Sequence, residues 1–261
     1  MKVVFTDLDG TLLDADTYSC EAARTGLRLL KDREIPLVIC TSKTRSEIMY
    51  WRRQLGNHHP FISENGGGIY IPEGYFDIPV DHDRTTDGYL VIERGTPYRE
   101  LTGVLDELAA RFPLQGFHDM TPADLAADAG LSLPEARRAL TRDYDEPFIL
   151  HDRARTSDLQ SAIRDRGLQL VEGGRYFHLT GGQDKGQAVR ILAALYEREH
   201  GDVVTVGVGD AANDVPMLDA VDHPYLVARP DGTYASDAYP WAGGIGPAGW
   251  NRVIRREIRP D

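Results

Sequence analysis

The sequence has little cysteine, no excess of positive charge and no long hydrophobic run. Its two cysteines, Cys20 and Cys40, do not form a spaced pair that could bind a metal or build a disulfide framework, which fits a reducing compartment. The 41 acidic residues outnumber the 29 basic ones, and the formal net charge of −12 argues against a nucleic acid or an anionic membrane as partner. The longest apolar stretch is about half of the roughly 20 residues that a membrane span needs, and residues 1–7 lack the apolar region of a signal peptide. We therefore expect a cytoplasmic protein.

Apolar residues are present in the proportion that a folded globular protein needs. Hydrophobic residues make up 41% and charged residues 27% of the chain, close to the average for soluble domains. At 261 residues, the length allows either one domain with a large insertion or two domains in series. The order of the predicted elements decides between these two arrangements.

Short apolar runs alternate with amphipathic segments at both ends of the chain. The run at 2–6 is β-branched and aromatic and breaks into an acidic turn, which predicts a buried strand. The helix expected after it has Ser19 as its cap and apolar positions at helical spacing. This alternation predicts a doubly wound, Rossmann-like α/β core with a parallel sheet. Its strands are expected at 2–6, 35–40, 61–63 and 203–208, and its helices at 19–33, 46–55 and 185–200.

The middle of the chain has a different character. Residues 89–179 contain short strands and helices that predict a smaller α+β unit, inserted into the core. A stretch rich in proline, glycine and aspartate, 72–87, is the expected entry to the insertion, and Gly181-Gly182 is its expected exit. We therefore predict a core domain made of 1–82 and 180–261 and an inserted domain of 83–179.

Two aspartates, Asp7 and Asp9, follow the first predicted strand and precede Gly10-Thr11. One carboxylate in such a pair can attack a phosphoryl group, while the other, as an acid, protonates the leaving oxygen. Two like charges this close need a cation, and oxygen ligands suit Mg²⁺. The alternative interpretation is an ordinary acidic turn, since aspartate and glycine are common turn residues.

Further polar residues stand at the ends of other predicted core elements. Asp210 and Asp214 follow the strand at 203–208 and offer carboxylates to a metal and to its surroundings. Lys185 begins a helix, where its ammonium group and the helix N-terminus can both face an anion. Thr41 ends the second strand and offers a hydroxyl and a backbone N–H to a phosphate oxygen. Together these residues favour phosphoryl chemistry over an ordinary turn.

In this order, the motifs resemble those of the haloacid dehalogenase superfamily of phosphatases. The resemblance implies that Asp7 is the nucleophile and Asp9 the general acid and base. It also implies that Lys185 and the hydroxyl of Thr41 hold the phosphoryl oxygens, with Ser42 as the alternative hydroxyl. The motifs that carry the resemblance are Asp7-Leu8-Asp9-Gly10-Thr11, Thr41, Lys185 and the segment from Gly209-Asp210 through Asp214.

The same resemblance implies Mg²⁺ as the cofactor. Its ligands would be Asp7, the backbone carbonyl of Asp9, and Asp210, with Asp214 in support. The insertion of about a hundred residues resembles the large α/β cap (C2 type) of the Cof-like branch of this superfamily. Such a cap implies substrate selectivity and exclusion of water from the reacting groups.

A finer resemblance concerns the substrate. Several segments resemble the family of mannosyl-3-phosphoglycerate phosphatases, which implies hydrolysis of that phosphorylated sugar-glycerate to mannosylglycerate, a compatible solute, and phosphate. The alternatives are a phosphatase of another sugar phosphate (sucrose-phosphate-like or general Cof-type), a phosphomutase and a non-catalytic sugar-phosphate-binding protein. The segments that carry the resemblance are 41–47, 64–69, 121–148 and 174–179 together with Asp184-Lys185-Gly186.

A glycerate carboxylate in the substrate needs N–H groups or positive charge beyond the phosphoryl pocket. Glycine-rich turns can present successive N–H groups as an anion nest, and an arginine fork suits a carboxylate. Each candidate also has an ordinary interpretation as a turn, a solvated charge or a core histidine. The predicted substrate-binding residues are Lys43, Asn65, Gly66, Gly67, Arg175, His178 and Gln183.

Overall fold

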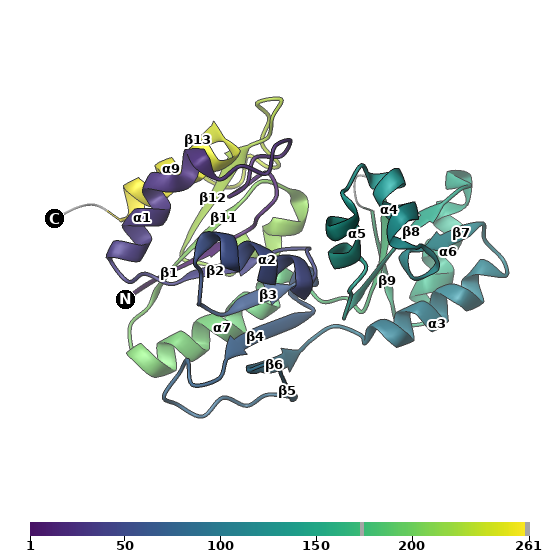
Figure 1. The fold of residues 1–261 in the computed structure, drawn as a ribbon, viewed down its shortest axis with the longest axis horizontal. Coiled ribbons are helices and arrows are strands. Elements are labelled where there is room, and N and C mark those ends of the chain that lie inside the picture. Colours follow the sequence, from purple (N-terminus) through teal and green to yellow (C-terminus); the bar gives the residue numbers. More distant parts are fainter. Residues whose placement is uncertain (173–174, 259–261) are drawn as a thin grey trace. The chain divides into compact units, whose positions relative to one another are not determined.

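The chain folds into two compact units (Figure 1). The structure is a computed structural model that describes residues 1–172 and 175–258. The first unit comprises Met1–Ser42, Asn57–Ile92 and Asp184–Asp261, and the second comprises Lys43–Gly56 and Glu93–Gln183.

A large, mostly parallel sheet forms the first unit. Its strand order is β13-β12-β11-β1-β2-β3-β4-β6-β5. The strands from β13 to β3 run parallel, whereas β4 is antiparallel to β3 and β5 to β6. The strands are β1 (Lys2–Thr6), β2 (Leu37–Cys40), β3 (Phe61–Ser63), β4 (Gly68–Pro72), β5 (Arg84–Thr86), β6 (Tyr89–Glu93), β11 (Val204–Gly209), β12 (His223–Ala228) and β13 (Trp241–Ile245).

Helices cover both faces of this sheet. Because side chains alternate along a strand, Val3 and Phe5 of β1 join one hydrophobic cluster with Leu192 of a long helix, α7. The next side chain along, Thr6, faces the other way and accepts a hydrogen bond from the buried indole of Trp250 in α9, 3.0 Å away. Figure 1 shows α1 and α9 on one side of the sheet and α7 on the other. The helices of this unit are α1 (Arg24–Asp32), α7 (Lys185–His200), α8 (Val215–Leu218) and α9 (Gly246–Glu257).

The path of the chain through the sheet reverses at its first strand. From β1 the chain proceeds to β2 and β3 on one side, and it later fills β11, β12 and β13 on the other. In doubly wound sheets, ligands bind outside the carboxyl ends of the strands at such a reversal. A ligand site is therefore expected at the carboxyl ends of β1 and β11.

The second unit is built on a four-stranded antiparallel sheet, in the order β7-β8-β10-β9. On one face, Phe148 and Phe177 pack with apolar residues of α3 and α6. On the other face, Ile149 packs with apolar residues of α4 and α5. The strands are β7 (Leu114–Gly116), β8 (Asp145–Leu150), β9 (Gln169–Glu172) and β10 (Phe177–Thr180), and the helices are α3 (Tyr98–Ala109), α4 (Pro122–Ala129), α5 (Leu133–Ala139) and α6 (Thr156–Arg164).

One helix of the second unit, α2 (Arg45–Leu55), comes from the segment that joins β2 to β3. Thr44 and Glu47 form a capping box at its start, and Gly56 ends it in the left-handed conformation. The Thr44 hydroxyl also donates a 2.9 Å hydrogen bond to the carbonyl of Arg138, and the Arg138 guanidinium lies 4.4 Å above the ring of Tyr50. These contacts join α2 to α5.

The predicted fold class, a doubly wound α/β core with a smaller α+β unit, is confirmed. The chain passes between the compact units at 42/43, 56/57, 92/93 and 183/184, whereas the predicted domain boundaries lie at 82/83 and 179/180. Residues 43–56, predicted as part of the core domain, belong to the second unit. At the entry the boundary differs because β5 lies within the predicted entry stretch, 72–87, β6 follows it, and both strands belong to the first sheet. Within the described ranges, none of the helices combines the length and the apolar character required to traverse a bilayer.

Candidate active site

The loop after β1 is held tightly at the carboxyl end of the sheet. Asp7 continues the strand, and its N–H donates a 3.0 Å hydrogen bond to the carbonyl of Val208 in β11. Gly10 then takes a positive φ of 72°, and a Cβ at this position would lie 2.9 Å from a carboxylate oxygen of Asp210. A glycine is therefore needed there, because the backbone turns left-handed against the Asp210 side chain.

The ammonium group of Lys185 is fully buried and is shared by two carboxylates. Its Nζ donates to Oδ1 of Asp7 at 2.7 Å and to Oδ1 of Asp214 at 2.6 Å. Lys185 is the first residue of α7, whose N-cap is Asp184. A Cβ on Gly186 would lie 2.2 Å from the carbonyl oxygen of Pro216, so glycine lets the start of α7 approach α8.

Asp214 uses both of its carboxylate oxygens within the protein. Oδ1 accepts from Lys185, and Oδ2 accepts the backbone N–H groups of Asp210 at 2.9 Å and Ala211 at 3.0 Å. Asp214 thereby shapes the loop that follows β11, as a capping box does at a helix start. This arrangement suits a supporting role more than direct metal binding.

Three carboxylates in this region lie close enough to share one ion. Oxygens of Asp7, Asp210 and Asp214 all lie within 4.8 Å of one another. Burial, opposed by Lys185 and reinforced by the neighbouring carboxylates, raises the pKa of Asp7 to about 8. Burial and Asp214 raise the pKa of Asp210 to about 6. Burial works against the charge on Lys185, but Asp214 and Asp7 outweigh it and raise its pKa.

The electrostatics of this cluster indicate more negative charge than the single ammonium group neutralises. A set of oxygen donors with uncompensated charge is what a hard divalent cation such as Mg²⁺ requires. The residues present therefore fit such an ion. The sequence did not predict the contact that Thr11 makes with this cluster. Its hydroxyl donates a 2.8 Å hydrogen bond to Oδ1 of Asp210. Its place in the first motif was visible, but its partner lies far along the chain.

Thr41 follows β2, is buried, and contacts the turn Glu64–Gly66, which packs beside the start of α7. Its carbonyl accepts the N–H of Asn65 at 3.0 Å. Asn65 and Gly66 both have positive φ, and a Cβ on Gly66 would lie 2.3 Å from the carbonyl oxygen of Asp184. The Asn65 side chain also accepts a 3.1 Å hydrogen bond from Asn213. The structure thus brings the predicted threonine, lysine and asparagine segments to the same end of the sheet.

The predicted anion nest at Asn65, Gly66 and Gly67 is only partly available. The N–H of Asn65 is used by Thr41, and the N–H of Gly67 donates to the carbonyl of Glu64 at 3.1 Å. Two of the three N–H groups therefore close the turn, because a backbone that reverses this sharply satisfies its own donors first.

Four of the predicted substrate-binding residues lie in the second unit. Arg175 is exposed and pairs with Asp128 at 2.8 Å; Gly174, which precedes it in the predicted segment, lies outside the described residues. Lys43 lies 3.5 Å from Glu47, one helical turn further on. The Gln183 side chain accepts from the N–H of Gly181 and donates to the carbonyl of Tyr144, so both ends of its amide are used in joining chain segments.

His178 belongs to a largely buried group of charges. Its Nδ1 lies 2.9 Å from Oδ2 of Asp145, and Arg142 donates to the same oxygen at 3.1 Å. Although burial opposes it, His178 and Arg142 lower the pKa of Asp145. The sequence did not predict a role for Arg142 and Asp145. Their only local signal is a spacing of three residues, with Asp145 as the first residue of β8.

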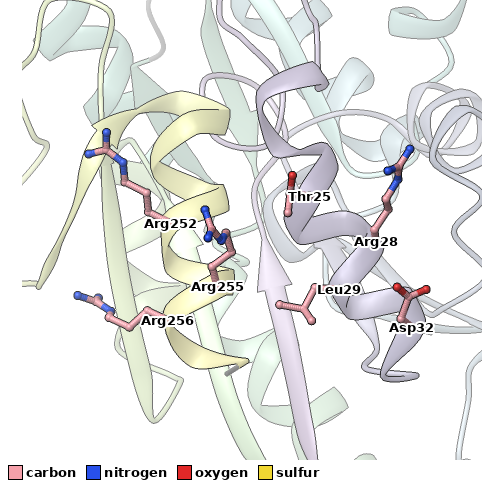
Figure 2. A pocket seen from close by; sticks show the side chains of 7 residues that line it. All are labelled: Thr25, Arg28, Leu29, Asp32, Arg252, Arg255 and Arg256. Atoms are coloured by element: carbon pink, nitrogen blue, oxygen red, sulfur yellow. The ribbon is translucent and has the colours of Figure 1, made fainter. Parts of the chain in front are cut away.

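A cavity of about 560 Å³ lies between α1 and α9 in the first unit (Figure 2). The arginines that line it do not converge. The Arg28 side chain points away from α9, and Arg256 lies over the ring of Tyr225, 4.3 Å from its centre. No predicted site residue lines this cavity, and we assign it no role. Its lining residues are Thr25, Arg28, Leu29, Asp32, Arg252, Arg255 and Arg256.

Comparisons with known proteins show the family of the chain. The model of the haloacid dehalogenase-like hydrolase family matches residues 4–82. A protein of Methanococcoides burtonii is 46% identical, with 97% of this chain and 95% of that protein covered. A protein of Persephonella marina is 40% identical, with 97% and 96% covered. The chain belongs to the haloacid dehalogenase-like hydrolase family, among its phosphatases, and the resemblance expected from the four motifs is confirmed.

The names of these relatives state a substrate. Those of M. burtonii and P. marina are both named glucosyl-3-phosphoglycerate/mannosyl-3-phosphoglycerate phosphatase. A protein of Pyrococcus furiosus, 34% identical with 87% of this chain and 91% of that protein covered, is named mannosyl-3-phosphoglycerate phosphatase.

Solved structures agree with the fold. A crystal structure from Thermoplasma acidophilum covers 99% of both chains with a TM-score of 0.71 at 17% identity. A phosphatase of the same superfamily from Bacteroides thetaiotaomicron covers 99% of this chain and 95% of its own with a TM-score of 0.69 at 18% identity.

Proposed function

We propose that the protein is a Mg²⁺-dependent phosphatase that hydrolyses mannosyl-3-phosphoglycerate to mannosylglycerate and phosphate. The observation that carries the proposal is the buried Lys185 ammonium group held between Asp7 and Asp214, beside Asp210, at the carboxyl end of β1. The names of the full-length relatives supply the substrate. Because two of those names include glucosyl-3-phosphoglycerate, this compound is the second candidate substrate.

In the proposed reaction, Asp7 is the nucleophile. Lys185 binds its Oδ1 and thereby fixes the carboxylate, so that Oδ2 attacks the phosphorus atom. The new bond joins Oδ2 to phosphorus while the bond from phosphorus to the glycerate oxygen breaks. Asp9 gives its proton to that leaving oxygen and later takes a proton from the water that attacks the phosphorylated Asp7, which releases phosphate.

The remaining residues of the site hold these groups in place. Thr41 and Lys185 are proposed to bind the phosphoryl oxygens. Asp7, the carbonyl of Asp9, and Asp210 would hold Mg²⁺, and Thr11 would orient the Asp210 carboxylate through its hydrogen bond. When bound, the ion supplies the positive charge that offsets the clustered carboxylates and the phosphoryl oxygens.

In the second unit, we propose that His178 is the strongest candidate for a substrate contact. Its side chain is 22% exposed, and Asp145 binds one ring nitrogen, Nδ1, which orients the other nitrogen, Nε2. Lys43 remains a proposed partner for the glycerate carboxylate. We propose no substrate contact for Gln183 and Arg175, since Gln183 bonds to the protein at both ends and Arg175 pairs with Asp128.

Phosphate release from a panel of phosphorylated metabolites tests the proposed function. The panel contains mannosyl-3-phosphoglycerate, glucosyl-3-phosphoglycerate, sucrose-6-phosphate, mannose-6-phosphate and 3-phosphoglycerate, each with Mg²⁺ and with EDTA. We expect kcat/KM for the two glycosyl-3-phosphoglycerates to exceed the others by at least about 100-fold, which is the scale that a few specific polar contacts provide. EDTA should abolish the activity.

Two other results of this panel would be informative. Metal-dependent release spread evenly over the simple sugar phosphates would reject the substrate and keep the phosphatase. No release from any compound would leave a non-catalytic binding protein as the better description.

Replacing Asp9 by asparagine tests its role as the general acid. The variant should lose about 10²–10⁴-fold in kcat on a glycosyl-3-phosphoglycerate, because the poor alkoxide leaving group needs a proton. With p-nitrophenyl phosphate, whose leaving group needs little protonation, the initial burst of p-nitrophenol should persist. An equal loss of the first step on both esters would contradict this assignment.

A further inference from the structure

The second unit contains a histidine surrounded by three carboxylates that has no part in the proposed phosphatase site. His118 lies in the short turn that follows β7, together with Asp119. Asp106 comes from α3 and Glu146 from β8. Three separate stretches of this unit therefore meet at one imidazole ring.

One side of the ring is held by a buried glutamate. The Glu146 side chain is 0% exposed, and its Oε1 lies 2.7 Å from Nδ1 of His118. The same oxygen accepts the backbone N–H of His118 at 3.2 Å. The other oxygen, Oε2, is buried and has no hydrogen-bond partner among residues 1–172 and 175–258. A Cβ on Gly116 would lie 2.4 Å from Nδ1 and 2.5 Å from Oε1, so this contact needs glycine beside it.

The other ring nitrogen faces two exposed carboxylates. Nε2 lies 3.0 Å from Oδ1 of Asp106 and 3.5 Å from Oδ1 of Asp119. All three atoms lie within 4.8 Å of one another. Two ligand atoms bound at about 2.0–2.1 Å to a tetrahedral zinc ion are about 3.4 Å apart, and the two separations from Nε2 lie on either side of that value.

The charge of this cluster also favours a cation. Three carboxylates surround one imidazole, and no lysine or arginine of the described part of the chain forms an ion pair with Asp106, Asp119 or Glu146. A carboxylate that receives Nδ1–H while Nε2 binds the metal is the usual support of a histidine ligand. Glu146 stands where that support is needed.

We propose that His118 Nε2, Asp106 and Asp119 form a second metal site that binds a zinc-type divalent ion, with Glu146 as the positioning residue. The exposure of the two aspartates, 67% and 54%, leaves room for water as the fourth ligand. A nitrogen donor separates this site from the all-oxygen cluster of the first unit, since imidazole favours zinc-type ions over Mg²⁺. The ion would tie α3 to the turn after β7.

Cobalt binding to the whole metal-free protein tests the proposal. Co²⁺ is added in excess Mg²⁺, and visible absorption reports a four-coordinate ion. We expect one equivalent to bind the wild type and His151→Gln, which changes an exposed histidine of the same unit. His118→Gln should lose this signal, and Asp106→Asn or Asp119→Asn should weaken it. Glu146→Gln should weaken binding about 10–100-fold, as loss of such a supporting carboxylate does.

A cobalt signal that survives in His118→Gln would overturn the proposal, and so would the absence of four-coordinate binding in the wild type. If His118→Gln does not fold, as judged by circular dichroism, NMR of the cobalt-loaded wild type decides. One paramagnetically shifted, exchangeable histidine N–H is expected from Nδ1 of His118, and its absence would refute the site. Because Mg²⁺-dependent phosphate release does not enter these measurements, failure here leaves the proposed function untouched.

Discussion

Replacing Asp7 by asparagine is expected to lower phosphate release by about 10⁴-fold or more, because the amide cannot form the bond to phosphorus. The folded protein should be as stable as the wild type or more stable. Burial raises the pKa of Asp7 to about 8, so its ionised form disfavours the folded state. Phosphate release and thermal unfolding in EDTA, measured on the same samples, separate the two effects.

The pH dependence of unfolding provides a second readout for this variant. The raised pKa means that the folded protein binds a proton at Asp7 more readily than the unfolded chain. The corresponding stability is fully present below pH 3.8 and is lost as the pH rises to about 8. The free energy of unfolding of the metal-free wild type, measured with urea, should therefore fall as the pH rises over this range. In Asp7→Asn this fall should be shallower.

A matched surface change separates this effect from general loss of charge. Asp16 is exposed, and Asp16→Asn should leave the rate of phosphate release unchanged. Retention of more than about 1% of wild-type turnover by Asp7→Asn would remove Asp7 as the nucleophile.

Replacing Lys185 by methionine should have the largest effect on stability. Methionine fills a similar volume but leaves the buried carboxylates of Asp7 and Asp214 without their shared cation. Breaking a buried ion pair in this way costs about 3–5 kcal/mol. We expect urea unfolding in EDTA to show a loss of this size and phosphate release to fall by about 10³-fold or more.

The double variant Lys185→Met/Asp214→Asn identifies the cause of this loss. Removing the second charge together with the first should recover part of the stability, because fewer unpaired carboxylates remain buried. Lys31→Met, on the exposed side of α1, should stay within about 0.5 kcal/mol of the wild type. A single variant Lys185→Met as stable as Lys31→Met would show that the ammonium group does not hold this cluster together.

The strand ends could be predicted from the sequence because they depend on local signals. The buried run at 2–6 and the acidic turn after it predict both β1 and the position of Asp7, and the glycine-punctuated run before Asp210 predicts β11 in the same way. Since parallel strands end at one edge of the sheet, these two predictions together placed the candidate site.

The remaining features depend on partners distant in the sequence. A glycine-rich segment predicts N–H groups that face an anion, but the carbonyl of Thr41 takes the N–H of Asn65 instead. Likewise, no local pattern shows that Glu146 contacts His118. Nor does one show that the chain within and after the stretch 72–87 adds the strands β5 and β6 to the first sheet. Contacts of this kind are decided by tertiary packing, which a single sequence does not display.

The second unit is built from two separate segments of the chain, which limits how it can be isolated. Because α2 belongs to it, the unit is discontinuous in sequence, and the chain passes between the two units at 42/43, 56/57, 92/93 and 183/184. A recombinant fragment of 93–183 alone would lack α2, and its α5 would lose the contacts of Arg138 with Thr44 and Tyr50. Transplanting this whole unit onto a related protein therefore requires two grafted segments, with 43–56 as the second.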